Sequence, residues 1–498
     1  MPHDMAPIEA KHYINGELVS SSDSATFDLF SPFNSELVAK VAEATNEDVD
    51  RAVAAAKAAL PAWSLLTPQE RGKPLKKLAE LIVAEMKELA RLDAISVGRP
   101  VDAYFDAGYA ATQLNYFSEA AYGTGTSSLN QPGFINISLR QPYGVGAAII
   151  PWNCPLVFFS KKAAPALAAG NTMLVKTSEK APLSCFRVSE LLNEAGFPPG
   201  VINVLHGHGA GAGAAISKHM EIRALSFTGS VRTGREIQKA AAMSNFKHLI
   251  FELGGKTPAV VFEDADVDRA AAETQFSIMW HNGQTCMANS RIFVHQAVAD
   301  RFITAFREQA AKRKFGDPTL SGVENGPMAD KAQYETVRRY IEEGKITGEA
   351  LTLDAAPPTE HSGLFVAPVI FVQQPGDSRV MREEIFGPVV SINKFETEEE
   401  ALRMANDTEY GLYASVYTKD IDRAMRFAKG FESGMVGVNC TSPTNSWDMP
   451  FGGTKQSGVG RESLLLSLED WLEQKAVFIK VEGLGGVSQS AQKSMINR

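Results

Sequence analysis

The strongest constraint on the fold is a regular alternation of helical and extended segments over residues 153–262. Helical spacing of apolar residues occurs at about 155–169, 183–195, 211–219 and 231–242, and the short apolar runs MLVK, INVL, ALSFT, LIFEL and AVVF lie between and after them. Strands that alternate with helices are typical of βαβ units, which build a mostly parallel, doubly wound sheet. The sequence therefore predicts an α/β fold.

A second α/β series follows the first. We expect strands at 291–295 and 389–395, and helices at about 297–313 and 397–405. A domain boundary is expected near 255–265, directly after the segment FELGGK.

Two helices near the N-terminus carry start signals. Thr45 and Asp48 have the spacing of a capping box, and apolar residues repeat at helical spacing behind them. Thr67 and Glu70 form a second box, followed by an apolar face that we expect to continue as one helix to a stop near Gly98.

Residues 134–150 show period-two alternation instead. The turn sequence Pro142-Tyr143-Gly144 lies in the middle of this segment, so an antiparallel hairpin is predicted. The run AVFIK at 476–480 has no strand partner nearby in the sequence. We expect it to pair with this hairpin or with another subunit.

Composition excludes several classes of protein. The chain has 498 residues, of which 44% are hydrophobic and 21% charged, as in globular proteins rather than disordered ones. Its 49 basic and 58 acidic residues give a net charge of −9. Without a basic face, neither nucleic acid nor a membrane surface is an expected partner. The nine histidines form no ligand cluster, so no metal site is expected.

Cysteine usage and the N-terminal sequence favour a cytoplasmic location. The spacing of the four cysteines fits neither a disulfide framework nor a zinc site, which favours a reducing compartment: Cys154, Cys185, Cys286 and Cys440. The first residues lack the basic and apolar regions of a signal peptide.

Cys286 lies in NGQTCMANS, a polar segment of small residues between a helix and a strand. A lone cysteine is most often a small buried hydrophobic residue, whereas a thiol in a loop is accessible as a nucleophile. The residues alone leave both interpretations open. The segment GHGAGAGAA at 207–215 has the spacing of a phosphate-binding loop, but no acidic residue ends the next strand, so it is a weak indication.

Glu252 ends an apolar strand in the segment FELGGK. An isolated glutamate is usually a solvated charge. Here the flanking Phe251, Leu253 and two glycines predict a partly desolvated carboxyl, whose pKa rises toward the range that suits a general base.

Seven motifs together resemble one family. In order and spacing they are similar to those of the NAD(P)-dependent aldehyde dehydrogenase superfamily: PWN at 151–153, KTSE at 176–179, SFTGS at 226–230, FELGGK at 251–256, GQTC at 283–286, EEIFGP at 383–388 and PFGGTKQSGVGRE at 450–462. The resemblance covers nearly the whole chain, and seven motifs in order are far more specific than one.

The resemblance implies catalytic roles for five residues. Cys286 resembles the nucleophile that forms a thiohemiacetal with the aldehyde, and Asn153 with the Cys286 backbone N–H resembles the oxyanion hole. Glu252 resembles the base that activates water to hydrolyse the thioester left by hydride transfer, whereas CoA-acylating relatives generally lack this glutamate. Lys162 and Glu462 match positions thought to relay the proton outward.

The resemblance also implies an NAD site. Lys176 and Glu179 match the pair that holds the adenine ribose, and a carboxylate there repels a 2′-phosphate, so NAD is expected to be preferred and NADP to be used more weakly. The full set of expected cofactor contacts is Pro151, Trp152, Lys176, Glu179, Gly229, Ser230, Leu253, Glu384 and Phe386.

The expected substrate pocket gives conflicting indications. Lys161 stands at a position that is aromatic in several relatives, so it either faces the pocket and favours an acidic aldehyde or extends away from it. The other expected lining residues favour an apolar group; the whole set is Phe158, Lys161, Thr285, Met287, Trp447 and Phe451. The residue after Asn153, often Phe in relatives, is Cys154.

By resemblance, the fold is an aldehyde dehydrogenase-like α/β fold. We expect a Rossmann-type NAD-binding domain at 1–120 and 143–255, a catalytic domain at 256–465, and a β oligomerisation element at 124–142 and 470–498, giving a homodimer or homotetramer. Two alternatives are a non-catalytic protein that retains the fold and an enzyme that mainly hydrolyses esters or thioesters.

Overall fold

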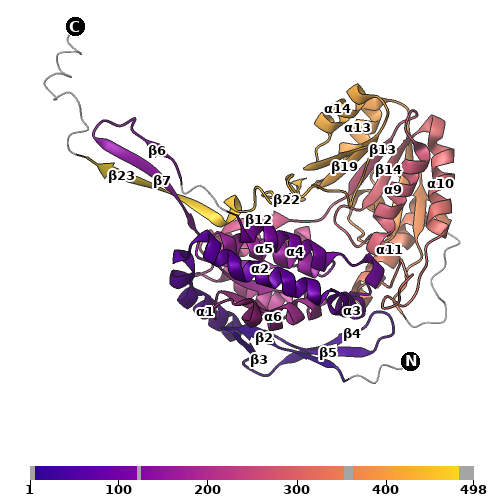
Figure 1. The fold of residues 1–498 in the computed structure, drawn as a ribbon. Helices are drawn as coiled ribbons and strands as arrows, with labels where there is room; N and C mark the ends of the chain where they lie inside the picture. Colours follow the sequence, from indigo (N-terminus) through magenta and orange to yellow (C-terminus); the bar gives the residue numbers. More distant parts are fainter. Residues whose placement is uncertain (1–5, 121–124, 353–362, 482–498) are drawn as a thin grey trace, which may run out of the picture.

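A computed structural model describes residues 6–120, 125–352 and 363–481. Two α/β bodies lie side by side, and the paired strands β7 and β23 extend from them as an arm (Figure 1). None of the helices in these described ranges is both long and apolar enough to span a bilayer.

The first body is built on an eight-stranded sheet with the order β22-β12-β11-β8-β9-β10-β2-β3. Its five central strands are parallel: β8 (Val145–Ile149), β9 (Thr172–Lys176), β10 (Ile202–Leu205), β11 (Ala224–Thr228) and β12 (His248–Glu252). The edges are antiparallel: β2 (His12–Ile14), β3 (Glu17–Val19) and β22 (Gly458–Val459). The predicted alternation is confirmed.

The helices of this body follow the predicted segments closely. They are α5 (Pro155–Ala168), α6 (Leu183–Ala195), α7 (Ala214–Lys218) and α8 (Val231–Ala242). The segment predicted as a helix at 211–219 begins instead as a π-helical turn, Gly209–Gly213, and only its second half is α-helical.

The second body is built on a seven-stranded sheet with the order β15-β16-β17-β14-β13-β19-β20. Its strands are β13 (Thr257–Val261), β14 (Asn289–His295), β15 (Glu349–Thr352), β16 (Val369–Val372), β17 (Val389–Phe395), β19 (Tyr413–Tyr417) and β20 (Met435–Val438). The main helices are α9 (Val267–Met279), α10 (Ala299–Ala311), α11 (Lys331–Thr347), α13 (Glu398–Asn406) and α14 (Ile421–Gly430). The chain passes from the first sheet to the second between Glu252 and Thr257.

Both predicted capping boxes are present, at the starts of α1 (Asn46–Leu65) and α2 (Pro68–Ala84). The prediction of a single helix from 68 to 98 is wrong, because the backbone leaves helical geometry at Glu85 and α3 (Met86–Val97) starts there. The break lets α2 pack on α4 (Asp106–Ser118) while α3 packs on α6. At the end of α3, Gly98 has φ +72, a left-handed conformation that favours glycine.

The predicted hairpin at 134–150 is wrong. β7 (Phe134–Pro142) does not pair with β8, which lies between β9 and β11 and is buried on both faces, as central parallel strands are. Instead β7 pairs antiparallel with the short β6 (Ser127–Ser128) and with β23 (Leu472–Lys480). The expectation that the 476–480 strand pairs with this region is confirmed.

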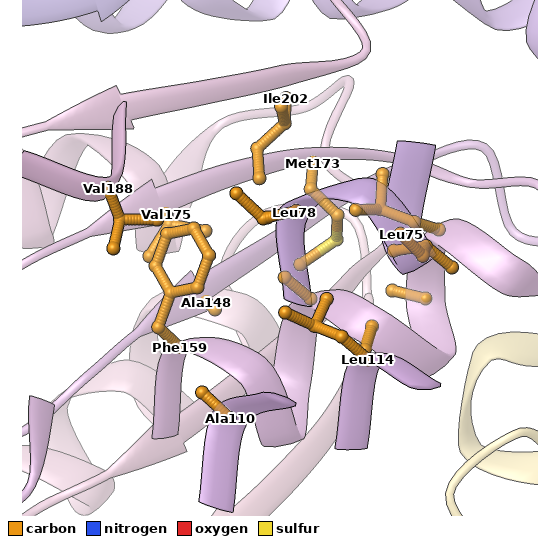
Figure 2. Close-up of a cluster of buried hydrophobic side chains, with 14 of the residues drawn as sticks. Leu75, Leu78, Ala110, Leu114, Ala148, Phe159, Met173, Val175, Val188 and Ile202 are labelled. Carbon is orange, nitrogen blue, oxygen red and sulfur yellow. The ribbon is translucent and has the colours of Figure 1, made fainter. Parts of the chain in front are cut away.

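The largest apolar cluster fixes α5 to the first sheet. Side chains from α2, α4 and α5 meet those of the central strands (Figure 2), including Leu78, Leu114, Phe159, Met173 and Val175. Each such side chain contributes on the order of 1.5–3 kcal/mol by its burial. Helix α5 is therefore rigidly placed, and it carries Phe158, Lys161 and Lys162 of the candidate site.

Asn171 joins the arm to the body. Its fully buried side-chain amide donates to the carbonyl oxygens of Ala166 (3.1 Å) and Trp471 (2.9 Å), and its Oδ1 accepts from the Gly144 N–H (3.0 Å). One side chain thus links the end of α5, the start of β23 and the turn between β7 and β8.

Replacing Asn171 with leucine is expected to lower the melting temperature substantially. The Ala166 carbonyl still accepts from the backbone N–H of residue 171, but the Trp471 carbonyl and the Gly144 N–H lose the side chain that binds them, and each such buried group costs about 1–3 kcal/mol. Calorimetry of Asn171→Leu beside Asn130→Leu, an exposed asparagine of the arm, measures the effect. Equal melting temperatures of the two variants would contradict it.

Candidate active site

Cys286 lies in a loop that is held by side-chain hydrogen bonds. His281 and Asn282, just before it, have φ of +48 and +54, which costs backbone energy that surrounding contacts must offset. The Asn282 amide donates to the Gly326 carbonyl (2.5 Å) and its Oδ1 accepts from Asn325 (2.5 Å). Gly283 leaves no room for a side chain, since a Cβ would lie 2.2 Å from the carbonyl oxygen of Gly387. The loop is thereby fixed.

Glu252 ends β12 and faces Cys286. Its side chain is buried, and neither carboxylate oxygen has a hydrogen-bond partner among the described residues. Burial raises the pKa of Glu252 to about 7, against the opposing effect of the Lys161 ammonium. Burial and the neighbouring Glu252 carboxylate also raise the pKa of the Cys286 thiol well above its usual value. The pair therefore favours a protonated thiol beside a carboxyl that titrates near neutral pH.

Asn153 precedes α5 and is nearly inaccessible to solvent, with 5% of its surface exposed. Its side-chain Nδ2 donates to the carbonyl oxygen of Gln284 at 3.0 Å, two residues before Cys286. An amide has two N–H donors. One fixes the orientation of the side chain toward the Cys286 loop, and the other can donate to a ligand.

Two consecutive lysines of α5 share one carboxylate. The buried Lys162 Nζ lies 2.9 Å from Glu462 Oε1 and 2.8 Å from Ser226 Oγ. The Lys161 Nζ lies 3.6 Å from Glu462 Oε2 and 3.2 Å from the ring centroid of Phe451. Burial raises the pKa of Glu462, but the two ammonium groups outweigh it and keep that pKa below its usual value.

A cavity of about 280 Å³ opens onto Cys286. Lys161 lines it, so this side chain faces the pocket rather than extending away, and so do the other five residues expected there. The complete lining is Phe105, Tyr109, Asn153, Cys154, Val157, Phe158, Lys161, Trp280, Thr285, Cys286, Met287, Pro443, Asn445, Trp447 and Phe451.

Three aromatic residues of this lining were missed by the sequence reasoning. Phe105 and Tyr109 lie at the start of α4, and Trp280 follows α9. The Tyr109 and Trp447 rings stack with centroids 4.6 Å apart. No local pattern marks these residues, because their contribution depends on how α4 packs against α5.

The residues expected at the cofactor lie at the carboxyl ends of the first sheet's strands and on the facing loop of the second body. Lys176 ends β9 with its Nζ 3.7 Å from Glu179 Oε2. Ser230 is the N-cap of α8, whose first N–H groups suit a phosphate. Glu384 accepts from the Gly255 N–H (2.9 Å), and burial raises its pKa to about 7.

The remaining expected contacts surround these groups. The rings of Trp152 and Phe386 meet edge to face at 5.4 Å. The Gly229 N–H donates to the Glu252 carbonyl oxygen, and the Leu253 N–H donates to the Ser457 carbonyl oxygen. Pro151 directly precedes Trp152 in the chain. A lysine–glutamate ion pair, a helix N-terminus and an aromatic edge are groups that fit a dinucleotide. In the glycine-rich 207–215 segment, by contrast, the His208 N–H donates to the chain's own Glu43.

Comparison with known proteins decides the family. The model of the aldehyde dehydrogenase family matches residues 18–477. This chain belongs to the aldehyde dehydrogenase family. It is 41% identical to aldehyde dehydrogenase 1A1 of Gallus gallus over 97% of this chain and 96% of that protein, and 40% identical to an aldehyde dehydrogenase of Emericella nidulans over 94% and 95%.

Solved structures agree with this assignment. A putative aldehyde dehydrogenase from Burkholderia cenocepacia has a TM-score of 0.93 at 37% identity, covering 97% of this chain and 99% of that one. Betaine aldehyde dehydrogenase from Staphylococcus aureus, solved in complex with NAD+, has a TM-score of 0.91 at 36% identity, covering 95% of each chain. The family and the aldehyde dehydrogenase-like α/β fold recognised from the seven motifs are confirmed.

Removing the Glu252 charge is expected to make Cys286 more reactive toward iodoacetamide. The carboxylate raises the pKa of the thiol, so Glu252→Gln lowers that pKa and increases the thiolate fraction at pH 8. A change of one pKa unit gives about a tenfold faster reaction. Peptide mass spectrometry measures the rate at Cys286, with Cys440 as the internal control, and an unchanged or slower rate would contradict the expectation.

Proposed function

We propose that Cys286, Glu252 and Asn153 carry out the family's reaction, the oxidation of an aldehyde to its carboxylic acid with NAD as cofactor. The observation that carries the proposal is the grouping of three side chains: the Cys286 thiol and the fixed Asn153 amide line one cavity, and the Glu252 carboxyl, whose pKa is about 7, lies beside the thiol. A fold without turnover requires none of these groups in this arrangement.

In the first step the Cys286 sulfur attacks the aldehyde carbon. The thiol proton passes to Glu252, which is ionised above pH 7 and next to the sulfur. Negative charge develops on the aldehyde oxygen, where the second Asn153 N–H and the Cys286 backbone N–H stabilise it. The product is a thiohemiacetal on Cys286, with its oxygen as the anion and the proton on Glu252.

The second step removes a hydride from the former aldehyde carbon and leaves a thioester on Cys286. Bound NAD supplies the acceptor for that hydride. Lys176 and Glu179 would hold the adenine ribose, the N-terminus of α8 at Ser230 the pyrophosphate, and Glu384 with Phe386 the nicotinamide ribose.

Hydrolysis of the thioester completes the cycle. Glu252 first loses the proton it accepted, which we propose travels through the buried Lys162–Glu462 pair. Glu252 then takes a proton from water as the oxygen attacks the thioester carbon, and the thiolate leaves. The carboxylic acid is released and Cys286 is regenerated. A base at this position favours transfer of the acyl group to water rather than to CoA.

The cavity lining indicates the kind of aldehyde. Aromatic rings surround most of the space, and the Lys161 charge is directed to Glu462 and the face of Phe451. We propose an aldehyde with an apolar body, because such a group buries best against aromatic rings. NADH formation with linear, aromatic and carboxylate-bearing aldehydes tests this, and Cys286→Ala tests the thiol mechanism. Absence of turnover in a folded protein that binds NAD would favour the non-catalytic alternative.

Glu252→Gln is expected to separate the two halves of the reaction. At pH 9 the variant forms about one equivalent of NADH per site and then stalls, because the thioester forms but no base activates water. Steady-state turnover falls by about 10²–10⁴-fold. Stopped-flow absorbance measures both phases beside Glu194→Gln, an exposed control. Steady-state turnover equal to that of the unmodified enzyme would show that Glu252 is not the base.

Glu179 is expected to set the preference for NAD over NADP. Replacing it with glutamine removes the repulsion of a 2′-phosphate, so the ratio of kcat/KM for NAD to that for NADP falls about fivefold to tenfold. The carboxylate is one third exposed, which limits the effect. Glu190→Gln removes an equal charge from α6 away from the site and serves as the control. A ratio unchanged in Glu179→Gln would contradict the assignment.

We further propose that the chain is organised and assembled as its sequence suggests. The units are an NAD-binding domain (1–120 and 143–255), a catalytic domain (256–465) and an oligomerisation element (124–142 and 470–498). Phe478 and Ile479 are exposed on β23, an edge strand of nine residues, which favours a homo-oligomer. A catalytic thiol must stay reduced, which favours the cytoplasm.

A further inference from the structure

Arg99 is a buried cation between two buried carboxylates. It follows α3, and only 1% of its surface is exposed. Its Nη2 lies 2.5 Å from Asp93 Oδ2 in α3, and its Nη1 lies 2.8 Å from Asp106 Oδ1, the first residue of α4. Taking three charges out of water costs several kcal/mol each, and apolar residues of similar size often fill such a space at no loss of stability. Stability alone therefore does not account for this cluster.

The same guanidinium reaches the backbone of the candidate site. Arg99 Nη1 donates to the carbonyl oxygen of Asn153 at 3.1 Å and lies 3.4 Å from Cys154 Sγ. It thus holds the peptide unit that directly follows the Asn153 side chain.

Asp106 lies near the next turn of the chain. Burial raises the pKa of Asp106, while Arg99 and the backbone N–H groups of Leu156 and Val157 in the first turn of α5 lower it. The N-cap of this helix, Cys154, has no side-chain capping bond of its own. A carboxylate near a helix N-terminus is favoured by the helix dipole.

We propose that Arg99 is a positioning residue for Asn153. This inference rests on the proposed role of Asn153 in the oxyanion hole. The arginine, itself held by Asp106, fixes the backbone carbonyl of Asn153 from one side, and the Asn153 Nδ2 bond to Gln284 fixes the side chain from the other. The amide donor is then held in place relative to the Cys286 sulfur before an aldehyde arrives, as an oxyanion hole requires.

The geometry calls for arginine rather than lysine. The two terminal nitrogens bind acceptors in different directions, Asp93 on one and Asp106 with Asn153 on the other. A lysine presents one nitrogen and cannot hold all three in place. Arg99→Lys keeps the positive charge, so it tests whether the two terminal nitrogens of the guanidinium are needed rather than whether the charge is needed.

A double-mutant cycle tests whether Arg99 acts through Asn153. The measurement is the single-turnover rate of NADH formation at saturating NAD and aldehyde, for Arg99→Lys, Asn153→Ala and the double variant. We expect Arg99→Lys to lower this rate about tenfold to a hundredfold, since small displacements of a positioned group cost that much. Asn153→Ala is expected to lower it about 10²–10³-fold. The single-turnover rate of the double variant should match that of Asn153→Ala within about twofold, because without the Asn153 amide the position set by Arg99 no longer affects the rate.

Arg71→Lys is the matched control. Arg71 is a buried arginine that donates to the carbonyl of Ala168 at the opposite end of α5. Its variant should keep the single-turnover rate, and the Kd for NAD should be unchanged in both arginine variants. If Arg99 had only a structural role, Arg99→Lys and Arg71→Lys would lower the single-turnover rate equally, and that result would overturn the inference.

The remaining outcomes separate this inference from the proposed function. If the effects of Arg99→Lys and Asn153→Ala multiply, Arg99 does not act through Asn153 and the inference is wrong, while the oxyanion role of Asn153 stands. If Asn153→Ala keeps the full rate, the oxyanion role fails and the inference fails with it. If Arg99→Lys does not fold, Asp106→Asn replaces it in the same cycle, where multiplying effects would again overturn the inference.

Discussion

Burial of the Glu252 carboxylate is the constraint on which the rest of the site depends. A buried carboxylate to which no group of the described residues donates a hydrogen bond, at the end of a sheet strand, is tolerated only because it can take up a proton near neutral pH. The last two residues of β12 pair with β22, and Gly458 allows that approach: a Cβ would lie 2.2 Å from the Phe251 carbonyl oxygen. The segment that contains β22 continues to Glu462, whose carboxylate pairs with both Lys161 and Lys162 of α5.

Helix α5 concentrates the charges that oppose this burial. Lys161 and Lys162 are consecutive, so on a helix their side chains diverge by about 100 degrees, and yet both reach Glu462, one to each carboxylate oxygen. This requires Glu462 to lie between them. The paired backbone of Phe451 and Glu462 achieves that, because it places the Phe451 ring beneath Lys161 and the carboxylate beside Lys162.

Local signals in the sequence predicted what local interactions determine. The capping boxes of α1 and α2 and the strands β9 to β14 and β17 follow from neighbouring residues. The motifs include Cys286 and Asn153, which line one cavity, and Glu252, which lies beside Cys286. The β7 hairpin was wrong because its partner, β23, lies near the other end of the chain. Arg99 was not predicted from the sequence for the same reason. A single buried arginine shows no periodic pattern, and its role depends on contacts with Asp106 and Asn153 that only tertiary packing forms.

Cys286 and Glu252 must be treated as one titrating pair. The Glu252 carboxylate raises the pKa of the Cys286 thiol, and by the same coupling a thiolate would disfavour ionisation of Glu252, so protons leave the pair in two steps that belong to neither residue alone. Over the pH range between those steps the site holds one proton, on sulfur or on carboxyl. In the mechanism that we propose, the form with the proton on Glu252 attacks the aldehyde, and the proton must then leave before water can be activated. The buried Lys162–Glu462 pair would take up that proton, which would account for the burial of these two side chains together with Glu252.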